Sequence, residues 1–467
     1  MNDIIAPLEC DTLVIGCDVV TLDGKKTVLP DGAIAIKDKR IAWIGPAAET
    51  RKHVQASDVL DAGGQIAMPG MIDGHFHTAQ QLLRGKLRAM VRDAPLKIPY
   101  WKNYLIPFES LLSPEDVHLS GLIAYTNMIS VGTTCFAEAG GPHPDEMGRA
   151  ALETGIRGLI SKSTIDKSTS IGSSVPDNMM MASDDALAAN VALVERWRKQ
   201  DQDRVKACLS LRQIIVCSQG LLQDMSGAAQ ELDVKIHTHL CEGTYEIDYA
   251  LEHHGCRPVE YLESLGILDH HLHCAHSVLL SPNEVDLYEK RRPSACHCAF
   301  NNYAMGAPRV MEMWRRGIDI GLGTDGASTF GTLDIFRVAH ATLIGQQAVS
   351  GTPWHMREAM LANETLEMAT CGGARSLGLQ DQIGSLEVGK RADILLARQD
   401  RIDQLPSYDP LFTAANNVVG QDVQTVIIDG TTVMKDREIL TVDVDRLKHE
   451  LTERLPGIMT RFERMVA

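Results

Sequence analysis

Apolar residues in the first 65 positions come in short runs that polar or glycine-containing dipeptides separate. The runs cover residues 12–16, 19–22, 33–36 and 41–45. Asp23-Gly24 and Asp31-Gly32 stand between runs and are typical of turns. Short apolar runs bounded in this way predict β-strands. We expect an all-β segment that is too small for a core of its own and packs against another part of the chain.

From residue 66 to about 383 the pattern changes to strands that alternate with helices, which predicts a parallel sheet. Helices are expected at 115–131, after the start signal Ser113-Pro114, and at 184–199. The predicted strand ends cover residues 75–77, 133–138, 158–161, 207–211, 235–239, 273–276, 294–297 and 318–325. This is the number of strands that closes a (β/α)8 barrel.

The chain returns to strand after the barrel. Residues 383–396 read as a strand, residues 426–433 as a hairpin with a glycine turn, and residues 443–466 as a closing helix. The expected fold class is therefore α/β, a TIM-like (β/α)8 barrel with a smaller composite β-sandwich domain formed by both chain ends. The expected domains are 1–65 plus 384–440 for the sandwich, 66–383 for the barrel, and 441–467 for a C-terminal helical extension.

The amino-acid composition limits which binding partners and which cellular compartment are expected for this protein. The net charge of −16 disfavours a nucleic-acid partner and an anionic membrane surface. No apolar run approaches the roughly 20 residues that span a bilayer, and the first residues show no signal-peptide pattern. The 11 scattered cysteines, including Cys296 and Cys298, predict reduced thiols in a cytoplasmic protein. A homo-oligomer, dimer or higher, stays open.

Two histidines with one residue between them follow the predicted strand that begins after Pro69-Gly70. Side chains at i and i+2 of a strand share a face, so His75 and His77 can bind one divalent metal ion. A chance pair among 17 histidines is the alternative. The active site of a barrel lies at the carboxyl ends of its strands. Those ends also carry His239, His276 and Asp325. Together these residues predict a metal site.

Glu242 follows His239 by three residues. A carboxylate beside a metal-activated water can carry a proton to the substrate. A solvated surface glutamate is the alternative if His239 is not a ligand.

With these residues in place, the chain resembles the amidohydrolase superfamily, in its aminohydrolase (deaminase) and triazine chlorohydrolase branch. The resemblance runs nearly end to end. Its motifs are PGMIDGHFH at 69–77, LLRG at 82–85, GTT at 132–134, HLCE at 239–242, LGTDGAS at 322–328 and EVGKRADILL at 387–396.

The resemblance implies that His75, His77, His239 and Asp325 bind one metal ion. It also implies that Glu242 is the proton shuttle, and that His276 and Asp325 deprotonate the attacking water. Members with two metals carry a bridging lysine late in the fourth strand, where this chain has Arg212. Zinc is the expected ion, and iron(II) is the alternative because this ligand set does not exclude it.

The implied reaction is the hydrolytic deamination of a small N-heterocycle, such as an oxopurine, pterin, pyrimidine or triazine-like ring, with release of ammonia. Glu242 favours deamination, because a halide leaves without protonation. The alternatives are a chlorohydrolase, an N-dealkylating enzyme, a cyclic-amide hydrolase, or a non-catalytic scaffold.

The substrate side departs from the family pattern. Leu211 and Arg212 stand where nucleoside-type members have a Pro-His pair, so that Arg212 and then Gln213 take the place of the histidine and the residue after it. The arginine fork suits a carbonyl or carboxylate, unless it pairs with a wall residue. Tyr100-Trp101 lacks the acid that binds a ribose, and either ring could stack on the substrate or pack at the barrel mouth. The predicted substrate-binding residues are Arg212, Gln213, Asn302, Tyr100, Trp101 and Ser328.

Overall fold

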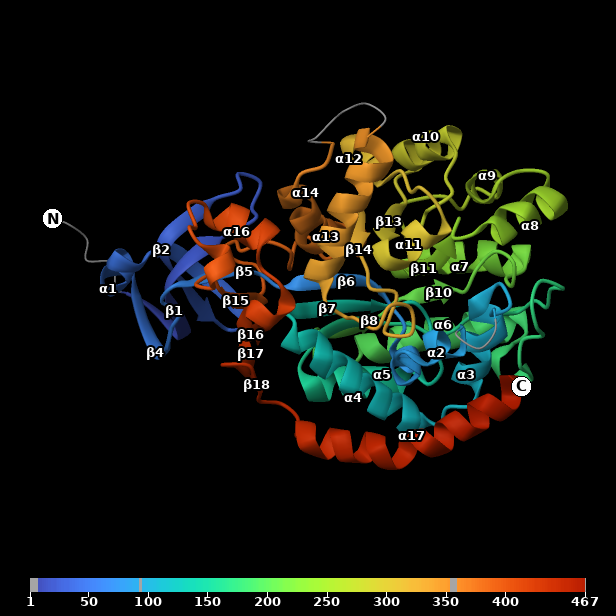
Figure 1. Cartoon of the computed structure of the whole chain (residues 1–467), viewed down its shortest axis with the longest axis horizontal. Coiled ribbons are helices and arrows are strands. Elements are labelled where there is room, and N and C mark those ends of the chain that lie inside the picture. The colour runs from blue at the N-terminus through green and yellow to red at the C-terminus, as the bar shows by residue number, and fades with distance from the viewer. Residues whose placement is uncertain (1–6, 92–94, 353–358, 467) are drawn as a thin grey trace.

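The computed structural model describes residues 7–91, 95–352 and 359–466 (Figure 1). Within these residues, the middle of the chain forms two parallel sheets, one of four strands and one of five. The first holds β6 (Met71–Phe76), β7 (Thr133–Glu138), β8 (Arg157–Ile160) and β9 (Val205–Ala207). The second holds β10 (Leu209–Leu211), β11 (Ile236–Leu240), β12 (Leu272–His276), β13 (Ser294–His297) and β14 (Ile320–Leu322).

Backbone hydrogen bonds lie near the junctions between the two parallel sheets. Cys208 alone separates β9 from β10, and its N–H donates to the carbonyl of Ile160, 3.0 Å away. At the other edge, the N–H of Asp325 donates to the carbonyl of His75 at 3.0 Å. A Cβ on Gly323 would lie 2.9 Å from His75, so the glycine permits this close approach. The predicted strands are all present, and the fourth is divided in two.

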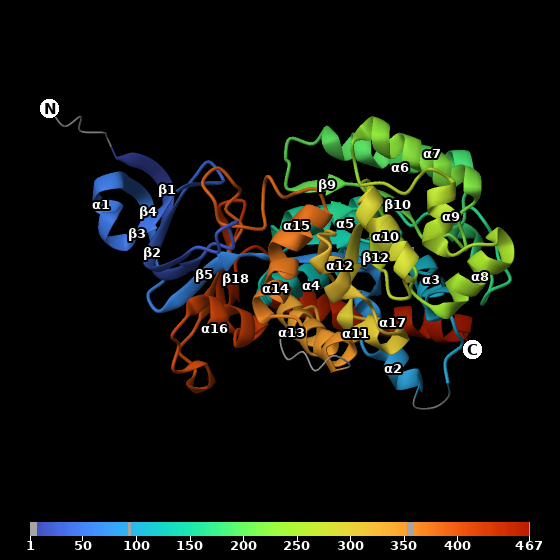
Figure 2. The same ribbon diagram turned by 90° about the horizontal axis from the view of Figure 1, so that it is seen from above.

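Both chain ends contribute to one further sheet, which has nine strands among the described residues. Figures 1 and 2 show its N-terminal (blue) and C-terminal (red) strands side by side. Its strand order is β18-β17-β16-β15-β5-β1-β2-β3, with β4 paired to β1. The strands are β1 (Leu8–Val20), β2 (Val28–Lys37), β3 (Arg40–Pro46), β4 (Val54–Asp61), β5 (Gln65–Pro69), β15 (Ile394–Arg398), β16 (Val423–Ile428), β17 (Thr431–Lys435) and β18 (Glu438–Ile439). The division of this sheet into two sandwich layers stays a prediction.

Three local predictions for the terminal strands are corrected. The first two predicted strands are one strand, β1, in which Gly16 adopts φ +82° at a shift of the pairing register. Asp31-Gly32 lies inside β2 because Gly32 pairs with Cys17. The C-terminal strand begins only at Ile394.

Helices pack around the parallel strands. The predicted 115–131 helix is α4 (Pro114–Ser130), whose cap is a reciprocal pair of hydrogen bonds between Ser113 and Asp116. The other helices are α1 (Thr50–His53), α2 (Lys86–Val91), α3 (Ile106–Ser110), α5 (Pro144–Thr154), α6 (Ser183–Arg198), α7 (Gln219–Leu232), α8 (Thr244–His254), α9 (Pro258–Ser264), α10 (Pro282–Arg291), α11 (Ala299–Met305), α12 (Val310–Arg315), α13 (Ile335–Gln346), α14 (Ala362–Glu367), α15 (Gly373–Ser376), α16 (Pro410–Asn416) and α17 (Val444–Val466). No helix in the described part of the chain has the length and apolarity needed to cross a bilayer.

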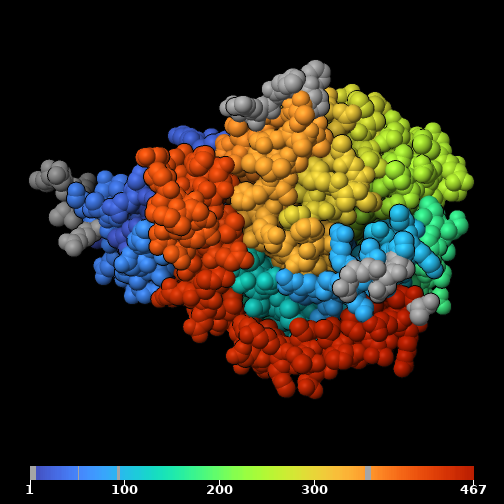
Figure 3. Space-filling model, viewed as in Figure 1, coloured from blue at the N-terminus to red at the C-terminus, as the bar shows by residue number. Residues whose placement is uncertain are grey.

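The closing helix α17 runs along the surface of the molecule, below α4 and α3 in Figures 1 and 3. The ring of Phe462 meets that of Phe108 edge to face at 5.4 Å. Arg454 donates to the buried carboxylate of Asp116 at 2.7 Å. The helix is thus attached both by apolar packing and by an ion pair.

A buried ion cluster joins the parallel sheets to the terminal sheet. Arg157 on β8 donates to both oxygens of Asp393, at 2.7 and 2.9 Å, and also to Asp429 at 3.2 Å. Arg391 donates to the same Asp429 carboxylate at 3.1 Å. Arg157, Asp393 and Asp429 are each about 3% exposed, so the pairs are shielded from water.

We expect Arg157→Met to lower the free energy of unfolding by about 3–5 kcal/mol, because it leaves buried carboxylates without their partner. Urea unfolding followed by circular dichroism measures the change. The exposed pair of Arg398 and Asp400 supplies the control, since Arg398→Met should change stability by less than about 0.5 kcal/mol. Equal stability of the Arg157 variant and the native chain would contradict the prediction.

Candidate metal centre

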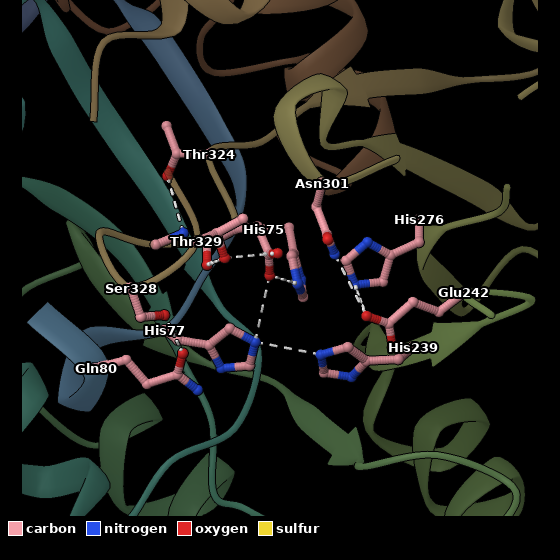
Figure 4. A network of polar contacts seen from close by, with 12 residues as sticks. His75, His77, Gln80, His239, Glu242, His276, Asn301, Thr324, Ser328 and Thr329 are labelled. Atoms are coloured by element: carbon pink, nitrogen blue, oxygen red, sulfur yellow. Dashed lines mark hydrogen bonds and ion pairs between the residues drawn. The ribbon is translucent and has the colours of Figure 1, made fainter. Parts of the chain in front are cut away.

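The predicted metal-binding side chains meet at the carboxyl ends of the parallel strands. His75 lies in β6, His77 directly after it, His239 in β11, and Asp325 after β14. Asp325 Oδ1 lies 3.2 Å from His75 Nε2 and 3.8 Å from His77 Nε2. His77 Nε2 lies 3.2 Å from His239 Nε2, and Figure 4 shows these two imidazoles facing each other. The structure therefore brings together all of the predicted ligands.

The chemistry of this donor set fits a divalent cation. Burial, followed by nearby positive charge, holds the pKa of His75, His77 and His239 well below the usual range, so the rings are neutral. His75 Nε2 is buried and has no hydrogen-bond partner among the described residues. Three neutral imidazoles and a carboxylate match the ligands of zinc or iron(II) sites, with a position left for water.

Residues behind the ligands orient their rings. His75 Nδ1 lies 2.8 Å from Nε2 of His237, and His239 Nδ1 lies 2.9 Å from the carbonyl oxygen of Arg212. Thr329 donates its hydroxyl to Asp325 Oδ2 at 2.9 Å. His237 was not among the predicted residues, although its spacing from His239 repeats that of His75 and His77 and was a usable signal.

His237→Phe should weaken zinc binding about 10–100-fold, because outer partners of a histidine ligand fix its tautomer and orientation. His237→Gln should recover most of the affinity, since its Oε1 can accept from His75 Nδ1. Competition with a chromogenic chelator measures the affinity. His254→Gln, a change at a half-exposed ring on α8, is the control. Native affinity in the phenylalanine variant would contradict the prediction.

Glu242 and His276 lie on the side of the centre next to His239 (Figure 4). Glu242 Oε1 is 3.8 Å from His276 Nε2, and Asn301 Nδ2 donates to the same oxygen at 3.4 Å. Burial by itself lowers the pKa of His276, but the Glu242 carboxylate and other acceptors raise it to about 10. A carboxylate that can carry a proton and an imidazolium that can donate a hydrogen bond thus lie next to the ligands.

A cavity of about 360 Å³ opens above this centre. His77, His239, Glu242, His276 and Asp325 form its polar end. Its outer wall is largely apolar and is built from Leu87, Leu96, Ile98, Pro99, Phe300 and Met305. Four predicted substrate-binding residues line it: Tyr100, Trp101, Arg212 and Ser328.

Two predicted substrate-binding residues do not line the cavity. Asn302 is buried behind His276, where its amide oxygen lies 3.0 Å from His276 Nδ1. Gln213 is also buried and donates to Glu246 at 3.2 Å. Gln213 misses the cavity because Arg212, the residue before it, is the one that lines the cavity. In the same way Asn301, and not Asn302, lines the cavity. Asn302 and Gln213 instead hydrogen-bond to the neighbouring side chains of His276 and Glu246.

Arg212 fits both interpretations of its sequence position. Its guanidinium is 2% exposed and lies 3.9 Å from the Glu109 carboxylate and 5.6 Å from the ring centre of Trp101. Its NH1 nitrogen has no hydrogen-bond partner in the described part of the chain. Glu109 was not predicted, because it lies on helix α3 and the prediction considered residues at the ends of strands.

The match to a known family decides what kind of protein carries this site. The sequence profile of the Amidohydrolase family matches residues 66–433. The chain belongs to the amidohydrolase family. The membership expected from the motifs is therefore confirmed.

Relatives of this amidohydrolase include named enzymes. A 5-methylthioadenosine/S-adenosylhomocysteine deaminase from Moorella thermoacetica is 31% identical over 445 residues, which cover 95% of this chain and 98% of the relative. An adenosine deaminase from Xanthomonas campestris with bound zinc superimposes with a TM-score of 0.87 at 27% identity, covering 97% and 100% of the two chains. The atrazine chlorohydrolase from Arthrobacter aurescens TC1, complexed with zinc, shares the fold with a TM-score of 0.81 at 22% identity, covering 95% and 100%.

Proposed function

We propose that this amidohydrolase is an aminohydrolase that binds one divalent metal ion, removes an exocyclic amino group from a small N-heterocycle and releases ammonia. The deaminases among its relatives support the class, a hydrolase of C–N bonds other than peptide bonds. The observation that carries the proposal is the placement of Glu242 and His276 beside the four-ligand centre. A binding scaffold would have no use for a proton carrier at this position.

The side chains supply a route for two protons. A metal ion held by His75, His77, His239 and Asp325 would supply the acidity that makes water nucleophilic near neutral pH. Asp325 accepts the first proton of the attacking water, to which His276 hydrogen-bonds, and this proton passes on to Glu242. Glu242 protonates the ring nitrogen next to the attacked carbon, so that the carbon becomes tetrahedral. The hydroxyl on the tetrahedral carbon then gives up the second proton, which passes through Glu242 to the amino group; the carbonyl forms as the carbon–nitrogen bond breaks, and ammonia leaves.

One metal ion, zinc rather than iron, is part of the proposal. No lysine is found among the described residues that line the cavity, so the bridging ligand of binuclear relatives is missing. Zinc is favoured because the Xanthomonas and Arthrobacter structures bind it.

We also propose that the two parallel sheets close as a (β/α)8 barrel over 66–383, with 1–65 and 384–440 as one composite sandwich domain and 441–467 as its helical extension. The hydrogen bond from Asp325 to His75 supports closure. A cytoplasmic location is supported by the 11 cysteines, which are all described and all unpaired.

The cavity wall favours an oxo-bearing or acidic heterocycle without a ribose. Arg212 offers a buried guanidinium that suits a carbonyl or carboxylate. Among the described residues of the lining, Glu242 and Asp325 are the carboxylates, and both belong to the metal end. A ribose diol would find no carboxylate farther out in the described part of this lining. The substrate thus differs from those named for the 5-methylthioadenosine deaminases.

Arg212→Met should raise the KM for the true substrate about 10–100-fold, with a smaller change in kcat, because a charged hydrogen bond to bound substrate is lost. Arg212→Lys should recover only part of the loss, since an ammonium cannot form the bidentate pair. Steady-state kinetics measures both constants. The exposed Arg464 gives a matched control, and an unchanged KM in the Arg212 variant would make this residue structural.

Metal analysis combined with an ammonia-release screen tests the function. The panel contains guanine, pterin, cytosine, melamine, adenosine and 5-methylthioadenosine. Ammonia from an oxo heterocycle by the metal-loaded chain supports the proposal. Chloride release from a chlorotriazine without ammonia release would favour the alternative leaving group. A metal-free, fully folded protein would favour the scaffold.

A further inference from the structure

We propose that Tyr245 and Trp101 are positioning residues that hold the Glu242 carboxylate in the orientation from which it delivers its proton. This inference rests on the proposed role of Glu242. Neither side chain was predicted to act in this way; Trp101 was a predicted substrate-binding residue, with packing at the barrel mouth as the alternative.

A chain of hydrogen bonds connects the three side chains. The Tyr245 hydroxyl donates to Glu242 Oε2 at 2.8 Å. The Trp101 indole N–H donates to the Tyr245 oxygen at 3.0 Å. An indole N–H can only donate and a carboxylate only accepts, so the direction of both bonds is fixed. Burial and then the charge of Glu242 raise the pKa of Tyr245 well above the usual range, which keeps the phenol protonated as the donor.

The hydrogen bonds from Trp101 to Tyr245 and from Tyr245 to Glu242 occupy Oε2 of the carboxylate and leave Oε1 for the reaction. With Oε2 bound by Tyr245, Glu242 directs Oε1 toward His276 Nε2, 3.8 Å away. The backbone N–H of Glu242 donates separately to Glu246 at 3.0 Å. Different residues therefore hold the backbone and the side chain of Glu242. The phenol hydrogen bond is charge-assisted, which makes it stronger than a neutral one.

Trp101 also links this chain to the substrate-binding cation. Its ring lies 5.6 Å from the Arg212 guanidinium, while its N–H is used on Tyr245. Both Trp101 and Tyr245 line the cavity, so direct contact with substrate is the competing role for each. Positioning predicts a loss in kcat, whereas substrate contact predicts a rise in KM.

Two substitutions remove the hydrogen bonds and keep an aromatic ring at each position, although phenyl is smaller than the indole of Trp101. In the full-length zinc-loaded enzyme, Tyr245→Phe should lower kcat about 10–50-fold and Trp101→Phe about 3–10-fold, with KM changed less than twofold, because misdirected catalytic groups slow the chemical step. The double variant should match Tyr245→Phe alone, because Trp101 acts through Tyr245. The substrate is whichever heterocycle of the six-compound panel releases ammonia fastest.

The controls separate this inference from the proposed function. Tyr261→Phe alters a buried tyrosine on α9 that stacks on His254 outside the cavity, and it should keep native kinetics. A native kcat in Tyr245→Phe, or a raised KM with native kcat, would overturn positioning. Additive losses in the double variant would overturn the part played by Trp101. If Glu242→Gln keeps full activity, the proton-shuttle function itself fails, whatever the Tyr245 result.

Discussion

Glu242→Gln is expected to reduce kcat for ammonia release on the order of 10²–10⁴-fold while the metal stays bound. Glutamine keeps the size of the side chain and can still accept from Tyr245, but it cannot carry a proton. Glu242 is not among the four proposed ligands, so metal content should equal that of the native enzyme. Steady-state ammonia assays and elemental analysis of the same preparation measure both quantities.

The control for Glu242→Gln lies on the helix that follows. Glu252 is an exposed glutamate of α8, and Glu252→Gln should leave kcat and metal content unchanged. Full activity in Glu242→Gln would exclude proton transfer by this carboxylate. It would also point to a leaving group, such as halide, that needs no protonation.

The metal centre was predictable because its residues obey a rule of the fold. His75, His77, His239 and Asp325 all fall where a predicted parallel strand ends, and such ends meet at one side of a barrel. The i, i+2 spacing then selects the face of the strand. His237 has the same i, i+2 spacing from His239 on strand β11, so it could have been predicted as well.

The substrate end was less predictable because loops, not strands, build it. The direction of a side chain in a loop depends on the local turn, so adjacent residues such as Asn301 and Asn302 differ in whether they face the cavity. Arg212 faces the cavity while Gln213 does not, for the same reason. The contact of Trp101 with Tyr245 joins residues far apart in the sequence, and no spacing rule predicts it.

In the fold, too, features set by local sequence were predictable and features set by contacts between distant segments were not. Alternating strands and helices predicted the parallel sheets, and the glycine turn predicted the hairpin in which Asp429 and Gly430 have φ of 53° and 76°. The continuity of β1 through Gly16 depends on pairing with β2, a tertiary contact that overrides the local break. Pairing of distant strands, as between β5 and β15, decides which segments share a sheet.

Asp325→Asn is expected to weaken metal binding by at least about 100-fold, more than the 10–100-fold typical of losing an outer partner, because a charged ligand itself is removed. The rate should fall as well even when excess zinc fills the site, since the carboxylate that accepts the proton of the attacking water is gone. Zinc affinity by chelator competition and kcat at saturating zinc separate the two losses.

The backbone of Asp325 makes this substitution a clean test of charge. Its φ is 61°, a left-handed conformation that asparagine and aspartate both tolerate, so the fold should survive the change. The N–H of residue 325 still donates to the carbonyl of His75, and an asparagine can still accept from Thr329. Asp319→Asn, at a half-exposed ion pair with Arg375, is the matched control. Native zinc affinity in Asp325→Asn would remove this residue from the ligand set, whereas native affinity with a lost rate would limit it to proton transfer.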